Sequence, residues 1–183
     1  LQADDAYAGS QSFYRMEAAA REVFGKHYVL PVHQGRAAEN IISQVFIKKG
    51  QVIPMNYHFT TTKEHMELNG GKVLEIYTDD ALDIKSNVQF KGNIDIEKLK
   101  AVFEEYGSDG VAFVRMEAST NLIGGQPFSM QNMRDVRALC DQYNTMMVLD
   151  ASLIGENAYM IKQREPEFKN AEIKDILNEM CGY

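Results

Sequence analysis

The chain has 183 residues, of which 45% are hydrophobic and 25% charged, a composition typical of one soluble globular domain, here residues 1–183. Its net charge of −7 and pI near 5.1 argue against a surface for nucleic acid or anionic membranes, because such surfaces cluster Lys and Arg. No apolar run approaches the roughly 20 residues of a membrane span and the first residues do not resemble a signal peptide, so we expect a cytoplasmic protein without a membrane partner.

The first half of the chain alternates predicted helices and strands. Ser10 can cap a helix whose apolar residues follow helical spacing, and Gly25 can end it. The next elements are a strand over 27–32, a helix over 37–46, a strand over 51–55, a helix over 60–68 and a strand over 72–77. The polar segment 78–92 is expected to be a surface loop.

The same alternation continues in the second half. The predicted elements are a helix over 94–106, a strand over 111–116, a loop over 121–127, a helix from Ser129 to Tyr143, a fifth strand over 145–150, and helices near 156–165 and 172–180. Strands that alternate with helices predict an α/β fold with a mainly parallel sheet and helices on both faces.

Several turns from strand to helix carry candidate ligand-binding residues. These turns open on the same edge of a parallel sheet, where such sheets bind ligands. The candidates on this edge are Gln34, Gly35, Arg36, Phe59, Asn121 and Asp150. Asp150 is the strongest of them, because it ends an apolar strand that cannot solvate a carboxylate, and we therefore expect a cationic partner for it.

Each candidate also has an ordinary structural interpretation. Gly35 and Arg36 can bind an oxyanion at a helix start, or form a simple turn with a solvated arginine. Phe59 can stack on a planar ring or belong to the core, and Asn121 can bind a phenolic oxygen or order its own Gly-Gly loop. Pyridoxal phosphate would satisfy the whole set. A phosphate-binding α/β domain unrelated to pyridoxal phosphate is the alternative. The turn at Gly35 matches neither GxGxxG nor GxxxxGK(S/T), which excludes the nucleotide-binding fingerprints.

Six segments carry a resemblance to a known family. They are AYAGSQSFYRME, PVHQGRAAENIISQ, FTTTKEHMELNGG, FKGNIDIEKL, NLIGGQPFSMQNMRDVR and ENAYMIKQRE. The sequence resembles the family of tyrosine phenol-lyase and tryptophanase, which are β-eliminating lyases of the aspartate-aminotransferase fold type (pyridoxal-phosphate fold type I). The short stretch IKKGQVIPMN and the segment FTTT are nearer tyrosine phenol-lyase. The resemblance implies that the chain forms part of the large domain of that fold.

The resemblance also implies roles for individual residues. Gln34, Gly35 and Arg36 match the phosphate-binding turn, Phe59 the aromatic ring stacked on the cofactor, Asn121 the ligand of its phenolic oxygen and Asp150 the partner of its pyridine nitrogen. Tyr7 matches a tyrosine that crosses the subunit interface and acts as an acid near the leaving group. The family forms tetramers, and two neighbouring sheet strands are missing from this chain. The first strand must then pair with the fifth or leave an exposed edge, so we expect a homo-oligomer.

Three departures from the family pattern affect the expected function. The Ser-Gly/Ala-Lys-Lys motif that attaches the cofactor is not in this sequence, and Lys162 lies in a helix that the family also has. Covalent attachment is therefore not expected in this chain. Leu153 stands where the family has an arginine that helps hold the phenolic oxygen. Asp5 stands where the family has a glutamate that helps bind a monovalent cation, which makes Asp5 a candidate K⁺ ligand.

We therefore expect part of a pyridoxal-phosphate-dependent lyase. The whole enzyme would convert an aromatic amino acid, tyrosine before tryptophan, to an aromatic leaving group, pyruvate and ammonia, and this chain alone would be inactive. The alternative is a non-catalytic remnant that binds phosphate or pyridoxal phosphate weakly, or only self-associates.

Overall fold

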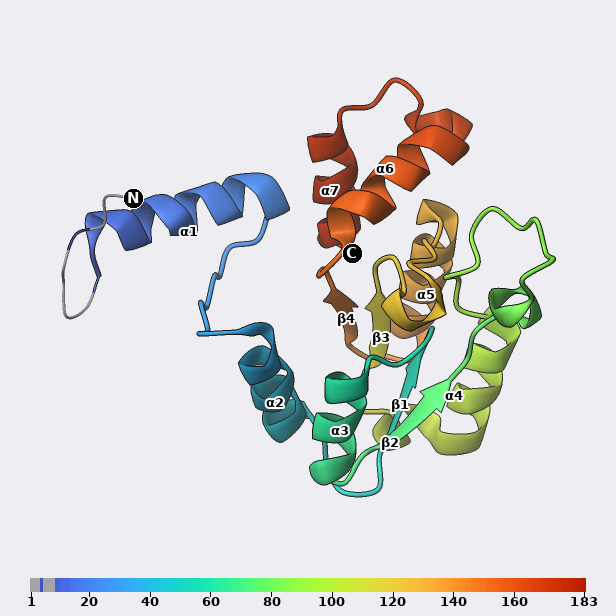
Figure 1. Cartoon of the computed structure of the whole chain (residues 1–183). Coiled ribbons are helices and arrows are strands. Elements are labelled where there is room, and N and C mark those ends of the chain that lie inside the picture. Colours follow the sequence, from blue (N-terminus) through green and yellow to red (C-terminus); the bar gives the residue numbers. More distant parts are fainter. Residues whose placement is uncertain (1–3, 5–8) are drawn as a thin grey trace.

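The computed structural model, which describes Asp4 and residues 9–183, is built around a four-stranded parallel sheet (Figure 1). The strands are β1 (Val52–Met55), β2 (Lys72–Glu75), β3 (Val114–Glu117) and β4 (Met147–Asp150), in the order β2-β1-β3-β4. All three pairs of neighbouring strands are parallel. The predicted α/β class and parallel sheet are therefore confirmed.

Helices connect the strands and cover both faces of the sheet (Figure 1). They are α1 (Gln11–Phe24), α2 (Gly35–Phe46), α3 (Thr60–Leu68), α4 (Ile96–Gly110), α5 (Met130–Gln142), α6 (Ile154–Arg164) and α7 (Ile173–Gly182). Helix α3 joins β1 to β2, α4 joins β2 to β3, and α5 joins β3 to β4. Because parallel neighbours require such crossovers, the starts of the helices gather at the carboxyl edge of the sheet.

Successive strand residues pack into two separate apolar clusters. Ile53 and Phe113 lie in the cluster on the side of α2 and α3, whereas Val52, Val114 and Met116 lie in the larger cluster with α4, α5, α6 and α7. This alternation follows from the two-residue period of a strand. It places Arg115, between Val114 and Met116, on the α2–α3 side of the sheet.

The predicted strand over residues 27–32 is wrong, and the described sheet has four strands rather than five. The segment is an irregular connection between α1 and α2 (Figure 1). Tyr28 and Leu30 have 94% and 80% of their surface exposed. A strand exists only where a neighbouring strand takes up its backbone hydrogen bonds, and neither β4 nor any other described strand does so for this segment. The β4 edge is therefore unpaired within residues 9–183.

Helix α1 is the element least integrated into the fold. Ser10 caps it, as predicted, by accepting a hydrogen bond from the Phe13 N–H, and Gly25 ends it with a left-handed φ of 66°. None of its described residues is buried. It contacts α7, where Lys174 pairs with Glu22 at 2.6 Å, and otherwise stands away from the sheet (Figure 1).

Candidate functional site

One cavity of about 430 Å³ lies at the carboxyl edge of the sheet. The cofactor-binding residues predicted from the sequence all line it: Gln34, Gly35, Arg36, Phe59, Asn121 and Asp150. Glu39, Glu117, Ser152 and Leu153 are also in its wall. Residues from α2, α3, β3, β4 and the loops that follow these strands thus meet at one place, as expected for the ends of parallel strands.

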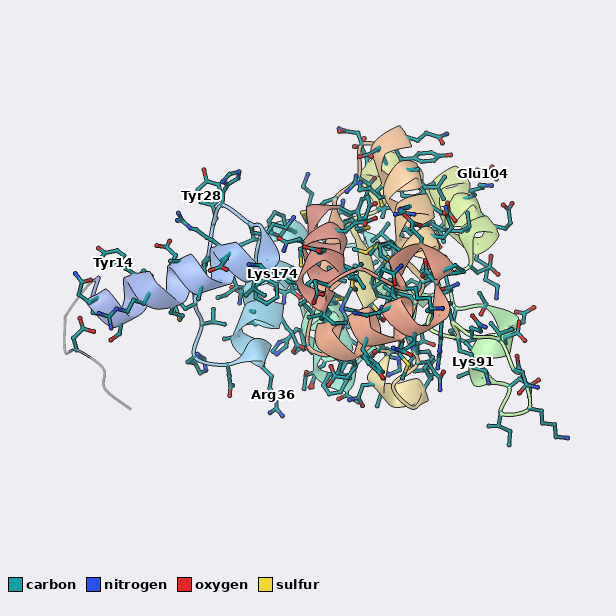
Figure 2. The ribbon with its side chains drawn as sticks, turned by 90° about the horizontal axis from the view of Figure 1, so that it is seen from above. Tyr14, Tyr28, Arg36, Lys91, Glu104 and Lys174 are labelled. Atoms are coloured by element: carbon teal, nitrogen blue, oxygen red, sulfur yellow. The ribbon has the colours of Figure 1, made fainter. Side chains whose placement is uncertain are left out.

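The start of α2 offers free backbone donors to this cavity. Gln34 is the N-cap residue in extended conformation, but its side chain makes no capping hydrogen bond. A Cβ on Gly35 would meet no atom within 4 Å, so packing does not require glycine here. Figure 2 shows Arg36 extending from this end of α2 away from the ribbon. The start of α2 is therefore suited to bind an anionic group, because it has unpaired N–H groups, no side chain at Gly35 and the cation of Arg36 nearby.

Phe59 immediately precedes α3 and is half-buried in the cavity wall. The helix that follows it is tied to α2 by Glu39, whose carboxylate accepts hydrogen bonds from the Thr61 and Thr62 hydroxyls at 2.8 and 2.5 Å. Hydrogen bonds to a charged group are among the stronger ones in proteins. Glu39 therefore fixes the two helix starts relative to each other across the cavity.

Asp150 is partly buried and has the cationic partner expected for it, which is Arg115. The distance from Arg115 Nη2 to Asp150 Oδ2 is 2.6 Å, and the same nitrogen lies 3.0 Å from Glu117 Oε2. The Arg115 side chain is only 2% exposed. The remaining oxygen, Asp150 Oδ1, accepts hydrogen bonds from the Ser152 N–H and hydroxyl.

Arg115 and Glu117 are site residues that were not predicted from the sequence. The available signal was the segment 114–117, VRME, in which two charged residues alternate with apolar ones in a strand between two helices. A charged residue in a buried strand is rare unless it is paired. The pair therefore indicated an internal ionic group, although only the tertiary structure identifies Asp150 as its third member.

The three charges do not cancel. One guanidinium faces two carboxylates, so the group of Arg115, Glu117 and Asp150 keeps one net negative charge when all three are ionised. Burial raises the pKa of Asp150, but the Arg115 guanidinium and the Ser152 hydrogen bonds outweigh it and leave this pKa below its ordinary value. Asp150 is therefore a carboxylate at neutral pH.

The ionic group continues to the loop that holds Asn121. Glu117 Oε1 accepts a hydrogen bond from the Asn121 N–H at 2.9 Å. The Gly124 and Gly125 N–H groups close the loop on the main-chain carbonyls of Asn121 and Thr120. Main-chain bonds thus order the Gly-Gly loop, and the exposed Asn121 side chain is available at the cavity wall.

Two predicted site residues, Tyr7 and Asp5, lie outside the described residues. Leu153 is in the cavity wall, at the place where the resemblance leads us to expect an arginine. Over the described part of the chain, no group of three or more His, Cys, Asp or Glu residues could hold a metal ion. Among residues 9–183, no helix combines the length and apolarity that crossing a bilayer would take.

Comparison with known proteins gives concordant matches. The model of the beta-eliminating lyase family matches residues 1–183. A tyrosine phenol-lyase from Pasteurella multocida is 47% identical over 180 residues, which are 98% of this chain and 39% of that protein. A second, from Symbiobacterium sp., is 45% identical over 183 residues, which are 100% of this chain and 40% of that protein. The chain thus spans about 40% of the length of the curated relatives it matches.

Solved structures support the same fold at lower sequence identity. A protein from Exiguobacterium sp. 255-15, provisionally assigned as an aromatic amino acid beta-eliminating lyase/threonine aldolase, matches with a TM-score of 0.66 and 14% identity; the match covers 98% of this chain and 44% of that one. The kynurenine aminotransferase of Pyrococcus horikoshii matches with a TM-score of 0.59 and 12% identity, covering 92% of this chain and 50% of that one. These likenesses show the fold.

Proposed function

Because the chain belongs to the beta-eliminating lyase family, we propose that its cavity is one part of the pyridoxal-phosphate site of such an enzyme. The observation that carries this proposal is that Arg115 is the single cation paired with two acidic side chains, Glu117 and Asp150, both of which line the cavity. A protonated pyridine nitrogen is a cation of suitable size and would complete the charge balance. Asp150 would hold the proton on that nitrogen.

The other predicted contacts suit the rest of the cofactor. The phosphate would bind the backbone N–H groups at Gly35 and the Arg36 guanidinium, with Gln34 beside them. The Phe59 ring would lie against the pyridine ring. The Asn121 amide would donate a hydrogen bond to the phenolic oxygen. All of these residues line the same cavity as Asp150.

The bound cofactor would supply an electron sink for bond cleavage at the substrate. This chain's residues would then bind and orient the ring, and Asp150 would keep its nitrogen protonated. Tyr7, by its match to the family pattern, would donate a proton near the leaving group. Following the names of the relatives, we propose L-tyrosine as the preferred substrate, with an aromatic leaving group, pyruvate and ammonia as products.

The proposed site is incomplete within residues 1–183. The Ser-Gly/Ala-Lys-Lys motif is not in this sequence, so we propose that the chain alone binds the cofactor without a covalent bond and does not catalyse elimination. A partner chain or further sequence would have to provide the lysine. Asp5 would belong to a K⁺ site between subunits.

The test is direct. The chain is mixed with pyridoxal phosphate, its absorbance and fluorescence are titrated, and a parallel sample is treated with borohydride and weighed by mass spectrometry. Saturable binding without a mass increase is expected, and pyruvate release from L-tyrosine should stay at background. Absence of binding would overturn the proposed site. A reduced cofactor adduct on a lysine would overturn the proposal that the chain alone is inactive.

Leu153 favours a second candidate, a non-catalytic remnant. It lies in the cavity wall and cannot donate the hydrogen bond that an arginine would give the phenolic oxygen. Restoring the arginine with Leu153→Arg separates the two candidates. Clearly tighter binding of pyridoxal phosphate by the variant than by the native chain favours the remnant, whereas equal binding shows that the site functions with leucine.

A further inference from the structure

Arg115 occupies an unusual position for a charged residue. It lies in the middle of β3 with 2% of its surface exposed, among the largest fully buried side chains of the described residues. Its Nη1 donates to the main-chain carbonyl of Tyr57, just beyond β1, at 3.3 Å. Its Nη2 reaches Asp150 in β4. The guanidinium, carried by β3, is therefore held by β4 on one side and by the segment just after β1 on the other, which fixes its orientation.

Through Glu117, Arg115 connects two residues that face different parts of the proposed ring. One Glu117 oxygen accepts from Arg115 and the other accepts from the Asn121 N–H at 2.9 Å. The Asn56 side chain holds the Glu117 main chain on both sides, accepting from its N–H and donating to its carbonyl, both at 3.0 Å. A continuous chain of hydrogen bonds thus runs from the Asp150 carboxylate to the Asn121 main chain.

We propose that Arg115 is a positioning residue of the cofactor site: together with Glu117 it sets the separation between the Asp150 carboxylate and Asn121, which would hold the pyridine nitrogen and the phenolic oxygen. The inference rests on the proposed function for the identity of the ring. Arg115 itself lines an adjoining cavity of about 220 Å³ that shares Asp150 and Ser152 with the first. It acts on the ring through Asp150.

The hydrogen bonds that Asp150 already accepts support this role of Arg115. A carboxylate offers about four acceptor positions, and this chain fills two on Asp150 Oδ1 and one on Oδ2. The position left for a ligand is on Oδ2, the oxygen that Arg115 holds. A buried ion pair is weak evidence for stability, since apolar residues of similar volume often serve as well. Positioning explains why the strand keeps these charges.

The test compares Arg115→Met, Glu117→Gln and the double variant with the native chain. Each single variant breaks the same connection, so each should weaken pyridoxal-phosphate binding by at least about tenfold, and the double variant should be no weaker than the worse single one. Arg137→Met is the control, because it removes an arginine–aspartate pair on α5, away from the cavity, in which the arginine is partly buried and the aspartate exposed. The control should bind as the native chain does.

A pH profile separates positioning from mere packing. The charged side chains around Asp150 are Arg115 and Glu117 from β3 and Arg36 and Glu39 from α2. Without the guanidinium, two neighbouring carboxylates remain, and one of them will bind a proton at higher pH. Relative to the native chain, binding by Arg115→Met should then acquire an additional dependence on pH, becoming weaker as the pH falls. Arg115→Lys restores the charge and should remove that dependence.

The connection can also be observed without cofactor. In amide NMR spectra of the chain, Arg115→Met and Glu117→Gln should both shift the Asn121 N–H resonance, although Arg115 does not touch Asn121. An unshifted resonance, or cofactor affinity unchanged in both variants, overturns the inference while the proposed function stands. If the native chain binds no pyridoxal phosphate, both the proposed function and the role of Arg115 toward the ring are overturned. A shifted Asn121 resonance would in that case show only a structural connection. If Arg115→Met does not fold, the cofactor affinity and the Asn121 resonance of Arg115→Lys and Glu117→Gln test the inference instead.

Discussion

Glu117 and Asp150 stand directly opposite each other in the parallel register of β3 and β4. Two acidic residues at such positions repel each other, and a single nitrogen, Arg115 Nη2, lies within 3.0 Å of both carboxylates. One guanidinium therefore faces two acidic side chains at this edge of the sheet. In the proposed site, the protonated pyridine nitrogen would be the second cation.

Replacing the central carboxylate should remove cofactor binding with little harm to the fold. Asp150→Asn keeps the size of the side chain, and Arg115 remains paired with Glu117. The proposed attraction to the ring nitrogen is lost, so we expect pyridoxal-phosphate affinity to fall at least about tenfold. Fluorescence titration measures it. Asp109→Asn, an exposed change on α4, is the control, and equal affinity in both variants would contradict the assignment of Asp150.

The depressed pKa of Asp150 predicts a specific loss of stability in acid. An aspartate has a pKa of about 3.9 in the unfolded chain, and the folded value lies lower. Its contribution is therefore fully present above about pH 4 and is lost as the pH falls through the folded pKa. Urea unfolding between pH 7 and pH 3 should show a steeper acid decline for the native chain than for Asp150→Asn. Parallel curves would count against this ion pair.

Glu39 should be a structural requirement of the cavity. Glu39→Ala removes both hydrogen bonds from Thr61 and Thr62, and bonds to a charged group contribute about 1.5–3 kcal/mol each. We expect the free energy of unfolding to fall by about 2–4 kcal/mol, together with weaker cofactor binding. Glu64→Ala, on the exposed side of α3, should change neither quantity. Chemical denaturation of the two variants decides the comparison.

Asn157, in the segment ENAYMIKQRE, should stabilise the segment between β3 and α5, which contains Asn121. It is fully buried; its side-chain oxygen accepts from the Ser119 and Phe128 N–H groups and its amide donates to the Phe128 carbonyl. Asn157→Ala leaves these groups unpaired, and each unpaired buried group costs about 1–3 kcal/mol. We expect a loss of about 3 kcal/mol or more. The neighbouring exposed change Glu156→Gln should be neutral, and a similarly small effect of Asn157→Ala would refute the prediction.

The chain should self-associate, as the sequence resemblance leads us to expect. Helix α1 has no buried residue among those described, and Tyr14, Met16 and Tyr28 expose 54%, 43% and 94% of their surfaces. Apolar surface of this extent is typically covered by a partner. Light scattering at micromolar concentration should give a mass of at least two chains. A stable monomer under these conditions would exclude the prediction.

Apart from the segment 27–32, the sequence alone determined the order of the elements, and it predicted the edge where the candidate residues meet. Periodicity fixes helices and strands locally, and in a parallel sheet every strand-to-helix turn opens on one side. Phe59, Asn121 and Asp150 could thus be placed together although they come from distant segments. Gln34 lines the same cavity although the strand predicted before it is absent from the described sheet. The requirement for a cation beside Asp150 was equally local, because an apolar strand cannot solvate a carboxylate.

Only the tertiary structure decided which residues satisfy those requirements. Segment 27–32 has the composition of a strand, but a strand depends on a neighbour to hydrogen-bond with, and no described neighbour takes that place. Arg115 meets Asp150 because β3 and β4 are adjacent, at a sequence separation of 35 residues. Backbone pairing and charge pairing are contacts between distant segments, so the pattern within one segment cannot specify its partner.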